Sequence, residues 1–135
     1  MYIMIIGCGR LGSTLAKELS DAGHDVSVIE RDSKKLGSLG SGFNGLCIKG
    51  IEFDNDVLTE AGIEHADYVL SVTPYDSINI TVSLIAMKIF KVPRIIARIN
   101  EPNKKSTYAS LGIETINPTE LSAYILKSRI EESHR

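Results

Sequence analysis

The chain has 135 residues, of which 43% are hydrophobic and 24% are charged, and this composition is ordinary for one globular domain with its own core. A net charge of -2, with no run rich in lysine and arginine, excludes the usual signature of a nucleic-acid-binding protein. The apolar runs have strand length and the N-terminus shows no signal-peptide pattern, so we expect a cytoplasmic protein without a membrane span.

The cysteines and histidines do not predict a metal site. Cys8 and Cys47 are too few for a disulfide framework or a metal-ligand set. Cys8 lies in a glycine-rich turn, where filling the turn is favoured over a redox role, and Cys47 is expected to be buried in a strand. His24, His65 and His134 are scattered without ligand spacing, so no metal is expected.

Segments of strand and helix character alternate along the chain, which predicts a parallel sheet with helices on both faces. The expected strands cover about residues 2–6, 25–29, 45–48, 68–72, 94–99 and 114–116. The expected helices cover about residues 10–22, 32–39, 56–61, 102–111 and 118–131. A further long helix is expected to start at Asp76 or Ser77, either of which could cap it, and to end before Pro93.

Apolar residues at helical spacing mark the faces that two of these helices are expected to bury. They are Leu11, Leu15 and Leu19 in the first helix, and Ile78, Val82, Ile85 and Ile89 in the long helix. The whole pattern predicts the α/β class: one domain, residues 1–135, with a Rossmann-like doubly wound parallel sheet in the strand order 3-2-1-4-5-6 and a C-terminal helix.

A glycine-rich turn between the first strand and the first helix is the main functional signal. It reads Gly7, Cys8, Gly9, Arg10, Leu11, Gly12. In a dinucleotide-binding turn, Gly7 permits the tight bend, Gly9 lets a pyrophosphate approach the backbone, and Gly12 lets the helix pack closely on the sheet. The free N–H groups and the positive dipole end of the helix would face the phosphates.

Glu30 ends the second strand, close to the offset at which a carboxylate meets a ribose diol. Glu30 would repel a 2′-phosphate and so disfavours NADP. Arg31 weakens that exclusion, because an arginine there can accept such a phosphate. The alternative for Glu30 is a solvated loop acid, but its place at a strand end favours a binding role.

Other candidates lie where further strands end, at the edge where a parallel sheet opens its ligand crevice. Arg10 could reach a terminal phosphate or be an exposed helix-start residue. The remaining candidates are Gly50, Ile51, Thr73, Asp76, Asn79 and Arg98. Asn79 could face ligand or solvent. Arg98 needs a partner if buried, such as a phosphate or the carboxylate of a subunit. Glu120 is a candidate partner, or else a first-turn acid that matches the dipole of the last helix.

These motifs together resemble the KTN or RCK N-terminal domain, also called TrkA-N, of Trk-type and Ktr-type potassium-uptake systems. The resemblance runs over nearly the whole chain, and its most diagnostic part places Thr73, Asp76 and Asn79 after the fourth strand. The matching segments are residues 5–12, 15–16, 23–26, 28–30, 61–63, 66–67, 72–79, 94–100, 111–113 and 117–118.

The resemblance implies a cytoplasmic regulator that binds NAD(H) or an adenine nucleotide (ATP, ADP or AMP) without turnover. It also implies a homodimer or larger ring on the inner face of the cell membrane, held there by a potassium channel or transporter subunit. Arg10 would contact the phosphate that distinguishes ATP from ADP, and Arg98 would lie near the subunit interface. Catalytic residues are not implied, and the chain shows no convincing Ser-His-Asp, Cys-His or Tyr/Lys arrangement.

One departure from the family pattern leaves alternatives open. Relatives commonly have an acid after the glycine at the third strand end, to reach the adenine amino group. Here Ile51 follows Gly50, and Glu52 could substitute only if the loop is shifted. A small NAD-dependent oxidoreductase, or the detached cofactor domain of one, is an alternative function; an interaction domain that has lost its ligand is another.

Overall fold

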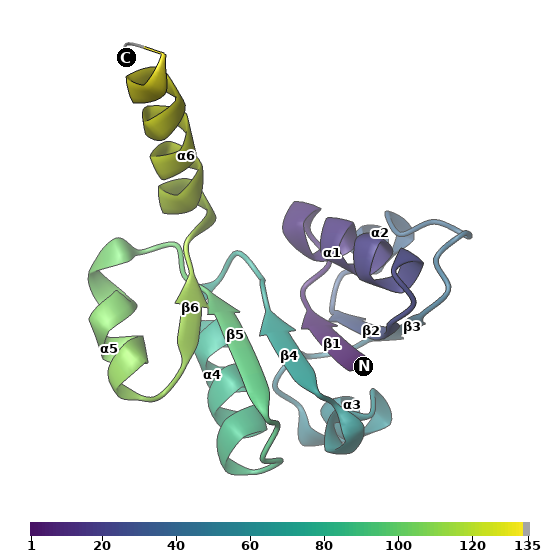
Figure 1. Ribbon diagram of the computed structural model, residues 1–135. Coiled ribbons are helices and arrows are strands. Elements are labelled where there is room, and N and C mark those ends of the chain that lie inside the picture. The colour runs from purple at the N-terminus through teal and green to yellow at the C-terminus, as the bar shows by residue number, and fades with distance from the viewer. Residues whose placement is uncertain (134–135) are drawn as a thin grey trace.

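Near-continuous apolar strands form the centre of the molecule (Figure 1). The computed structural model describes residues 1–133, and His134 lies outside this range. The strands are β1 (Tyr2–Ile6), β2 (Asp25–Glu30), β3 (Leu46–Lys49), β4 (Tyr68–Ser71), β5 (Arg94–Arg98) and β6 (Glu114–Ile116). All neighbouring strands pair in parallel, in the order β3-β2-β1-β4-β5-β6. The predicted strand order is therefore confirmed.

Helices follow the strands in the predicted alternation. They are α1 (Arg10–Asp21), α2 (Ser33–Gly37), α3 (Asn55–Glu60), α4 (Asp76–Lys88), α5 (Lys105–Ser110) and α6 (Pro118–Glu132). Two 3-10 turns, η1 (Ile63–His65) and η2 (Pro102–Lys104), complete the elements. The sequence did not predict η1, and the helix expected over 102–111 is divided between η2 and α5.

Alternation along the strands sends side chains into two apolar layers. On one face of the sheet, Met4 and Ile6 pack with residues of α3, η1 and α4. On the other face, Ile3 and Ile5 pack with residues of α1 and α2, and the three leucines predicted for the α1 face join this cluster half-buried. The doubly covered sheet is the predicted Rossmann-like arrangement, and it fixes the strand ends that could form a site.

Two burial predictions were wrong. Cys47 is exposed, because β3 is an edge strand that pairs only with β2, and Ile48 is the one residue of β3 that is buried. Ile89 is 57% exposed, because α4 ends at Lys88 and Ile89 is only its C-terminal cap. Val82 is fully buried, while Ile78 and Ile85 are partly buried against the same core.

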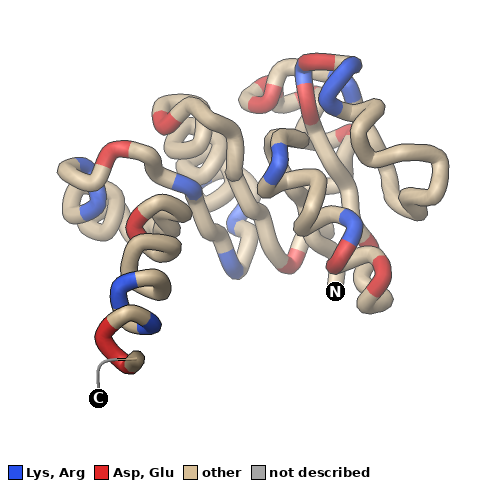
Figure 2. The backbone as a smooth tube through the Cα atoms, turned by 90° about the horizontal axis from the view of Figure 1, so that it is seen from above, with Lys and Arg blue, Asp and Glu red and all other residues tan. Residues whose placement is uncertain are grey.

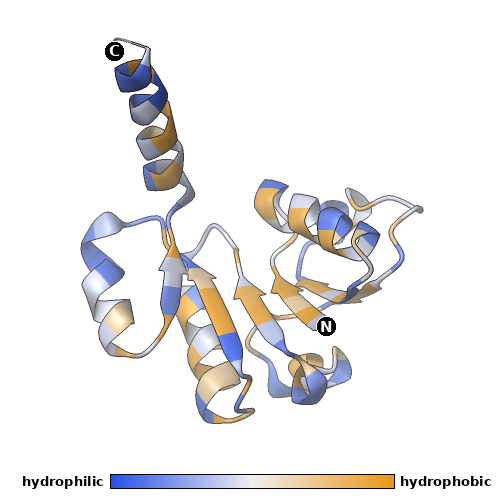
Figure 3. Ribbon diagram, in the orientation of Figure 1, coloured by the Kyte–Doolittle hydropathy of each residue, from blue (hydrophilic) through white to orange (hydrophobic). Residues whose placement is uncertain are grey.

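The last helix stands apart from the rest of the chain. In Figure 1, α6 projects away from the sheet, and none of its residues is buried. Figure 3 nevertheless shows hydrophobic positions along it. The exposed apolar side chains of α6 are Leu121, Tyr124, Ile125, Leu126 and Ile130.

Charged residues of both signs are interspersed along the described chain (Figure 2). Within residues 1–133, no helix has both the length and the apolar character needed to cross a membrane.

Candidate functional site

The glycine turn has the geometry that its sequence predicted. Gly7 has a φ of +101°, and a Cβ there would lie 2.9 Å from the Thr73 Cγ2 atom. At Gly12 a Cβ would lie 1.9 Å from the carbonyl oxygen of Gly7, so α1 can approach the strand only with glycine at this position. Around Gly9, in contrast, a Cβ would meet no atom within 4 Å. The turn is therefore packed at both ends and open in the middle.

The start of α1 beside Gly9 has no side-chain cap. Gly9 is the N-cap residue, and the first turn of the helix contains no acid. The N-terminal N–H groups of a helix lack partners within the helix, and the dipole there favours negative charge. A phosphate group fits this arrangement, because its oxygens can accept hydrogen bonds from those N–H groups in the open space over Gly9.

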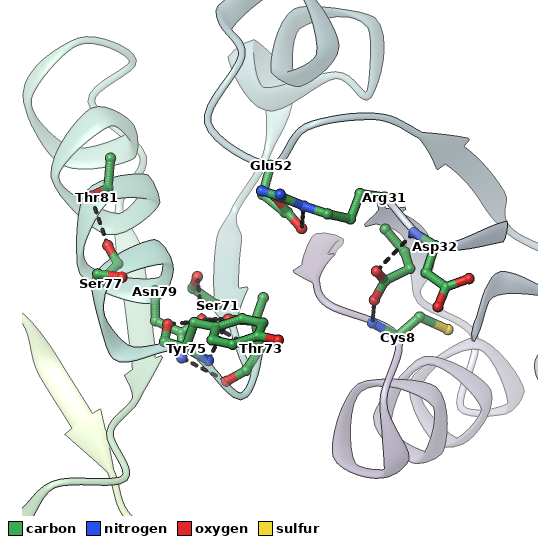
Figure 4. Close-up of polar contacts among 11 residues, drawn as sticks. Cys8, Arg31, Asp32, Glu52, Ser71, Thr73, Tyr75, Ser77, Asn79 and Thr81 are labelled. Carbon is green, nitrogen blue, oxygen red and sulfur yellow. Dashed lines mark hydrogen bonds and ion pairs between the residues drawn. The ribbon is translucent and has the colours of Figure 1, made fainter. Parts of the chain in front are cut away.

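Glu30 holds the turn from the end of β2 (Figure 4). Its Oε1 atom accepts a hydrogen bond from the Cys8 N–H at 2.8 Å, and its Oε2 atom accepts one from the Asp32 N–H at 3.1 Å. Glu30 is only 5% exposed, so it is not the solvated loop acid of the alternative interpretation. Each carboxylate oxygen has a second lone pair, so the group can still accept hydrogen bonds from a ribose.

Cys8 is almost completely buried within the turn, with its Sγ atom 3.9 Å from Ser38 Oγ. Cys8 is 1% exposed and belongs to the apolar cluster beneath α1, against which Leu11 also packs. Burial raises the pKa of the Cys8 thiol and so keeps it neutral. The expectation that Cys8 fills a tight turn agrees with this packing.

Arg31 and Glu52 form an ion pair at the ends of β2 and β3, which the sequence did not predict. The Arg31 Nε atom donates to both Glu52 oxygens at 3.0 Å, and Nη2 donates to Oε2 at 2.6 Å. The hydrogen bonds to Glu52 raise the pKa of Arg31 further. The side chain of Glu52 is 4% exposed and that of Arg31 is 49% exposed.

The loop after β3 turns Ile51 outward and Glu52 inward. Gly50 begins this loop, with its N–H donating to the Glu30 carbonyl at 3.2 Å and with no room for a Cβ against Val57. Ile51 is 47% exposed, whereas Glu52 is 3% exposed. A buried acid, Glu52, thus lies one residue after the position at which the sequence lacks one.

Asn79 is a buried clamp on the ends of β4 and β5 and does not face solvent. Its Oδ1 atom accepts from the Thr73 N–H at 2.9 Å, from Thr73 Oγ1 at 2.7 Å and from Ser71 Oγ at 3.3 Å. Its Nδ2 atom donates to the carbonyls of Thr73 and Arg98, both at 2.9 Å. With both amide donors used and 0% exposure, Asn79 positions Thr73.

Asp76 does not cap α4, and neither does Ser77, because the N-cap is Tyr75, without a side-chain bond. The Asp76 carboxylate instead crosses to the loop after β5. It accepts from the Asn100 N–H at 2.8 Å, from Asn100 Nδ2 at 2.9 Å and from the Glu101 N–H at 3.1 Å. Sequence reasoning missed Asn100, because only the fold brings it to Asp76.

Arg98 is half-buried, and its Nε atom donates to Asn100 Oδ1 at 3.1 Å. It forms no ion pair with Glu120 among the described residues. Glu120 instead lies in the first turn of α6, as the alternative interpretation expects, and the side chain of Asn117 caps this helix by accepting hydrogen bonds from the N–H groups of Thr119 and Glu120.

Two hollows adjoin the glycine turn. An open groove of about 340 Å³ is lined by Cys8, Gly9, Arg10, Ser13, Lys34, Lys35 and Ser38. A smaller hollow of about 170 Å³ is lined by Glu30, Arg31, Asp32, Lys35, Glu52, Thr73, Pro74 and Tyr75. The first has three cations and no acid; the second has the acids that suit hydroxyl groups.

The structure therefore brings most of the predicted site residues to one edge, with Arg10 exposed at the start of α1 and Thr73 on the opposite wall. Asp76, Asn79 and Arg98 lie behind that wall and hold the loops. Sequence reasoning missed Lys34 and Lys35, although their place at the start of the helix after Glu30 was a usable signal. Among residues 1–133, no cluster of His, Cys, Asp and Glu could hold a metal ion.

The strand order, the glycine turn and the acid at the end of β2 define a Rossmann-like domain. The model of one family, the TrkA-N domain, matches residues 3–118, and the chain belongs to this family.

The chain is 45% identical over 116 residues to the Trk system potassium uptake protein TrkA of Streptomyces coelicolor, an alignment that covers 86% of this chain and 52% of that protein. It spans about half the length of the curated relatives that it matches.

Solved structures share the fold. The GsuK RCK domain superposes with a TM-score of 0.82 at 25% identity, covering 98% of this chain and 28% of that one. GsuK is also matched with NAD bound and with ADP bound, at TM-scores of 0.73 and 0.72. The Kef C-terminal domain of Shewanella denitrificans, in its AMP-bound form, has a TM-score of 0.79 at 22% identity, covering 93% of this chain and 77% of that one.

Proposed function

We propose that this chain, residues 1–135, is the nucleotide-sensing domain of a potassium-uptake system, binding NAD(H) or an adenine nucleotide without turnover. The open, uncapped start of α1 over Gly9, beside the anchored carboxylate of Glu30, is the observation that carries this proposal. One part suits a phosphate and the other suits a ribose. Relatives named as Trk potassium uptake proteins, and solved neighbours with AMP, NAD or ADP bound, support it.

Each part of the edge has a role in this proposal. The backbone of the turn and the groove cations Arg10, Lys34 and Lys35 would neutralise the phosphates. Glu30 would accept the ribose hydroxyls, and the smaller hollow, reached by Glu52 and Thr73, would hold the adenosine. The loop at Gly50 and Ile51 would border it. Arg10, the exposed cation at the mouth of the groove, would make the site sensitive to the number of phosphates.

Regulation would arise from assembly. A ligand shifts an equilibrium only through its different affinities for two states, so the sensor needs two arrangements of its subunits. The exposed apolar side chains of α6 support a homodimer or larger ring, because a helix that buries none of its residues gains stability by packing on another chain. In this proposal the assembly sits on the cytoplasmic face of the membrane, bound to a potassium channel or transporter subunit.

The experiment that tests nucleotide binding is calorimetric titration of the purified chain with NAD, NADH, ATP, ADP and AMP. Gly9→Val should abolish binding without unfolding the protein, because the position has an extended backbone and empty surroundings. Gly42→Val is the matched control: it also has free space around the new side chain, but it lies outside the two hollows at the glycine turn. It should bind as the parent does.

Failure of all five ligands to bind the parent would overturn the proposal, and normal binding by Gly9→Val would place the ligand elsewhere. Turnover of a nicotinamide cofactor in a metabolite screen, followed by absorbance, would favour the oxidoreductase alternative.

Assembly has its own test, the molar mass in solution measured by light scattering. Leu126→Glu replaces one of the exposed apolar side chains of α6 by a charged one and should dissociate the oligomer. Lys127→Glu changes the charge at a neighbouring, 77% exposed side chain and should leave the mass unchanged. A monomeric parent would contradict this part of the proposal.

A further inference from the structure

The Arg31–Glu52 ion pair lies at the place where a nucleotide-binding site distinguishes a free ribose 2′-hydroxyl from a 2′-phosphate. Arg31 directly follows Glu30, and both line the smaller hollow. By position alone, Arg31 is the cation that could accept a 2′-phosphate despite the repulsion from Glu30. In the structure its Nε and Nη2 atoms instead donate three hydrogen bonds to Glu52, between 2.6 and 3.0 Å (Figure 4).

Burial makes this pairing hard to break. The Glu52 side chain is 4% exposed, and among the described residues Arg31 is its only ion-pair partner. If Arg31 turned to a phosphate, it would leave a buried carboxylate without compensation, which is strongly unfavourable. Half of the Arg31 side chain is in contact with solvent, so the buried acid, rather than packing, fixes its direction.

We propose that Glu52 is a specificity-determining residue: by holding the Arg31 guanidinium, it restricts the site to nucleotides with a free ribose 2′-hydroxyl and excludes 2′-phosphorylated nucleotides. This inference rests on the proposed nucleotide-binding function. Glu52 is a positioning residue for this purpose, because it acts through Arg31. From the sequence alone, Arg31 leaves open whether the site accepts a 2′-phosphate, and its pairing with Glu52 favours exclusion.

The charges around the hollow support the same direction. The ionisable residues that line it are Glu30, Arg31, Asp32, Lys35 and Glu52, three acids against two cations. A 2′-phosphate, with a charge near −2, would therefore enter a hollow of net negative charge. Replacing Glu52 by glutamine neutralises that excess and leaves the Arg31 charge uncompensated.

The experiment compares two probes that differ only in the group under discussion: adenosine 5′-monophosphate and adenosine 2′,5′-bisphosphate. Both are titrated calorimetrically into the parent, Glu52→Gln and the double variant Arg31→Met/Glu52→Gln. We expect the parent to bind the monophosphate at least about tenfold more tightly. Glu52→Gln should strengthen bisphosphate binding by on the order of tenfold and change monophosphate binding by less than about threefold.

The double variant shows whether Arg31 causes the gain in bisphosphate affinity. It has neither charge, so it leaves no buried acid unpaired, and it should lose the gain in bisphosphate affinity. A gain that persists there would overturn the role of Arg31, and an unchanged ratio of the two affinities in Glu52→Gln would overturn the role of Glu52. Both results would leave the proposed function intact. A parent that binds neither probe would overturn this inference, and the proposed function would fall as well only if NAD, NADH, ATP and ADP also failed to bind.

Thermal unfolding followed by circular dichroism checks that each variant is folded. If Glu52→Gln does not fold, Glu52→Asp replaces it. This change keeps the charge but withdraws the carboxylate by one methylene, so it should loosen Arg31 and shift the affinity ratio in the same direction by a smaller factor. An unchanged ratio in a folded Glu52→Asp protein would overturn the inference.

Discussion

The candidate site lies at the carboxyl ends of the strands, and its two halves use their polar groups in opposite ways. At the β1–β2 half, the start of α1 has no side-chain cap, and Gly9 has empty space around it. At the β4–β5 half, Asn79 and Asp76 use their side chains on the backbone of neighbouring loops. The open half leaves donors for a ligand; the closed half satisfies its own groups and supplies a rigid wall.

The difference shows that a polar residue at a strand end is not by itself a ligand contact. Thr73, Asp76 and Asn79 look alike in sequence as candidates for binding. In the structure only Thr73 lines a hollow, and Asn79 holds it there. Mutations should therefore separate the halves, with stability lost at the closed half and binding lost at the open one.

The largest loss of stability is expected for Asn79→Ala. The change removes five hydrogen bonds and leaves the buried Thr73 N–H and carbonyl without their partners. Unsatisfied buried polar groups cost about 1–3 kcal/mol each, so we expect the free energy of unfolding to fall by about 3–5 kcal/mol. Urea denaturation measures it.

Ser77→Ala is the control on the same helix. Ser77 is exposed, and its carbonyl rather than its hydroxyl accepts the hydrogen bond from Thr81, so the change should stay within about 0.5 kcal/mol. If the two variants were equally stable, Asn79 would not be the clamp described.

Glycine substitutions sharpen the comparison within the open half. Gly12→Ala places a Cβ 1.9 Å from the Gly7 carbonyl oxygen, so α1 must move from the sheet. Forcing extra atoms into close packing costs about 1–3 kcal/mol, and a fall of that size in the free energy of unfolding is expected. Gly9→Ala meets no atom within 4 Å and should unfold as the parent does in the same urea titration. A stable Gly12→Ala protein would contradict the close approach of the turn.

The sequence predicted the frame of this edge well, for a physical reason. Strand alternation, helical spacing and the glycine turn are local patterns, and the right-handed crossover rule converts them into one strand order. The place of Glu30 at the end of β2 was predicted for the same reason, whereas its contact with a ribose stays a prediction. The strand order and the open turn around Gly9 both agree with that reading.

The errors come from contacts between segments far apart in the chain. Arg31 and Glu52 are 21 residues apart, and Asp76 and Asn100 are 24 apart, so no local period could reveal either pair. The exposure of Cys47 follows from the edge position of β3, which depends on the whole sheet. Asn79 was placed on the correct turn of its helix, but the direction of its side chain depends on β5.

The last prediction concerns the rates at which the two cysteines are chemically modified, and it involves no change in stability. Cys8 lies in the glycine turn of the open half but is shielded there, being 1% exposed. Cys47 is exposed, so iodoacetamide should modify it faster than Cys8 by on the order of tenfold or more, as mass spectrometry of the digested protein would show. Desolvation raises the pKa of both thiols, and because the thiolate reacts, both rates should rise with pH in the alkaline range. Equal rates in the folded protein would mean that the turn opens readily and exposes Cys8, which would contradict a rigid turn held by Glu30.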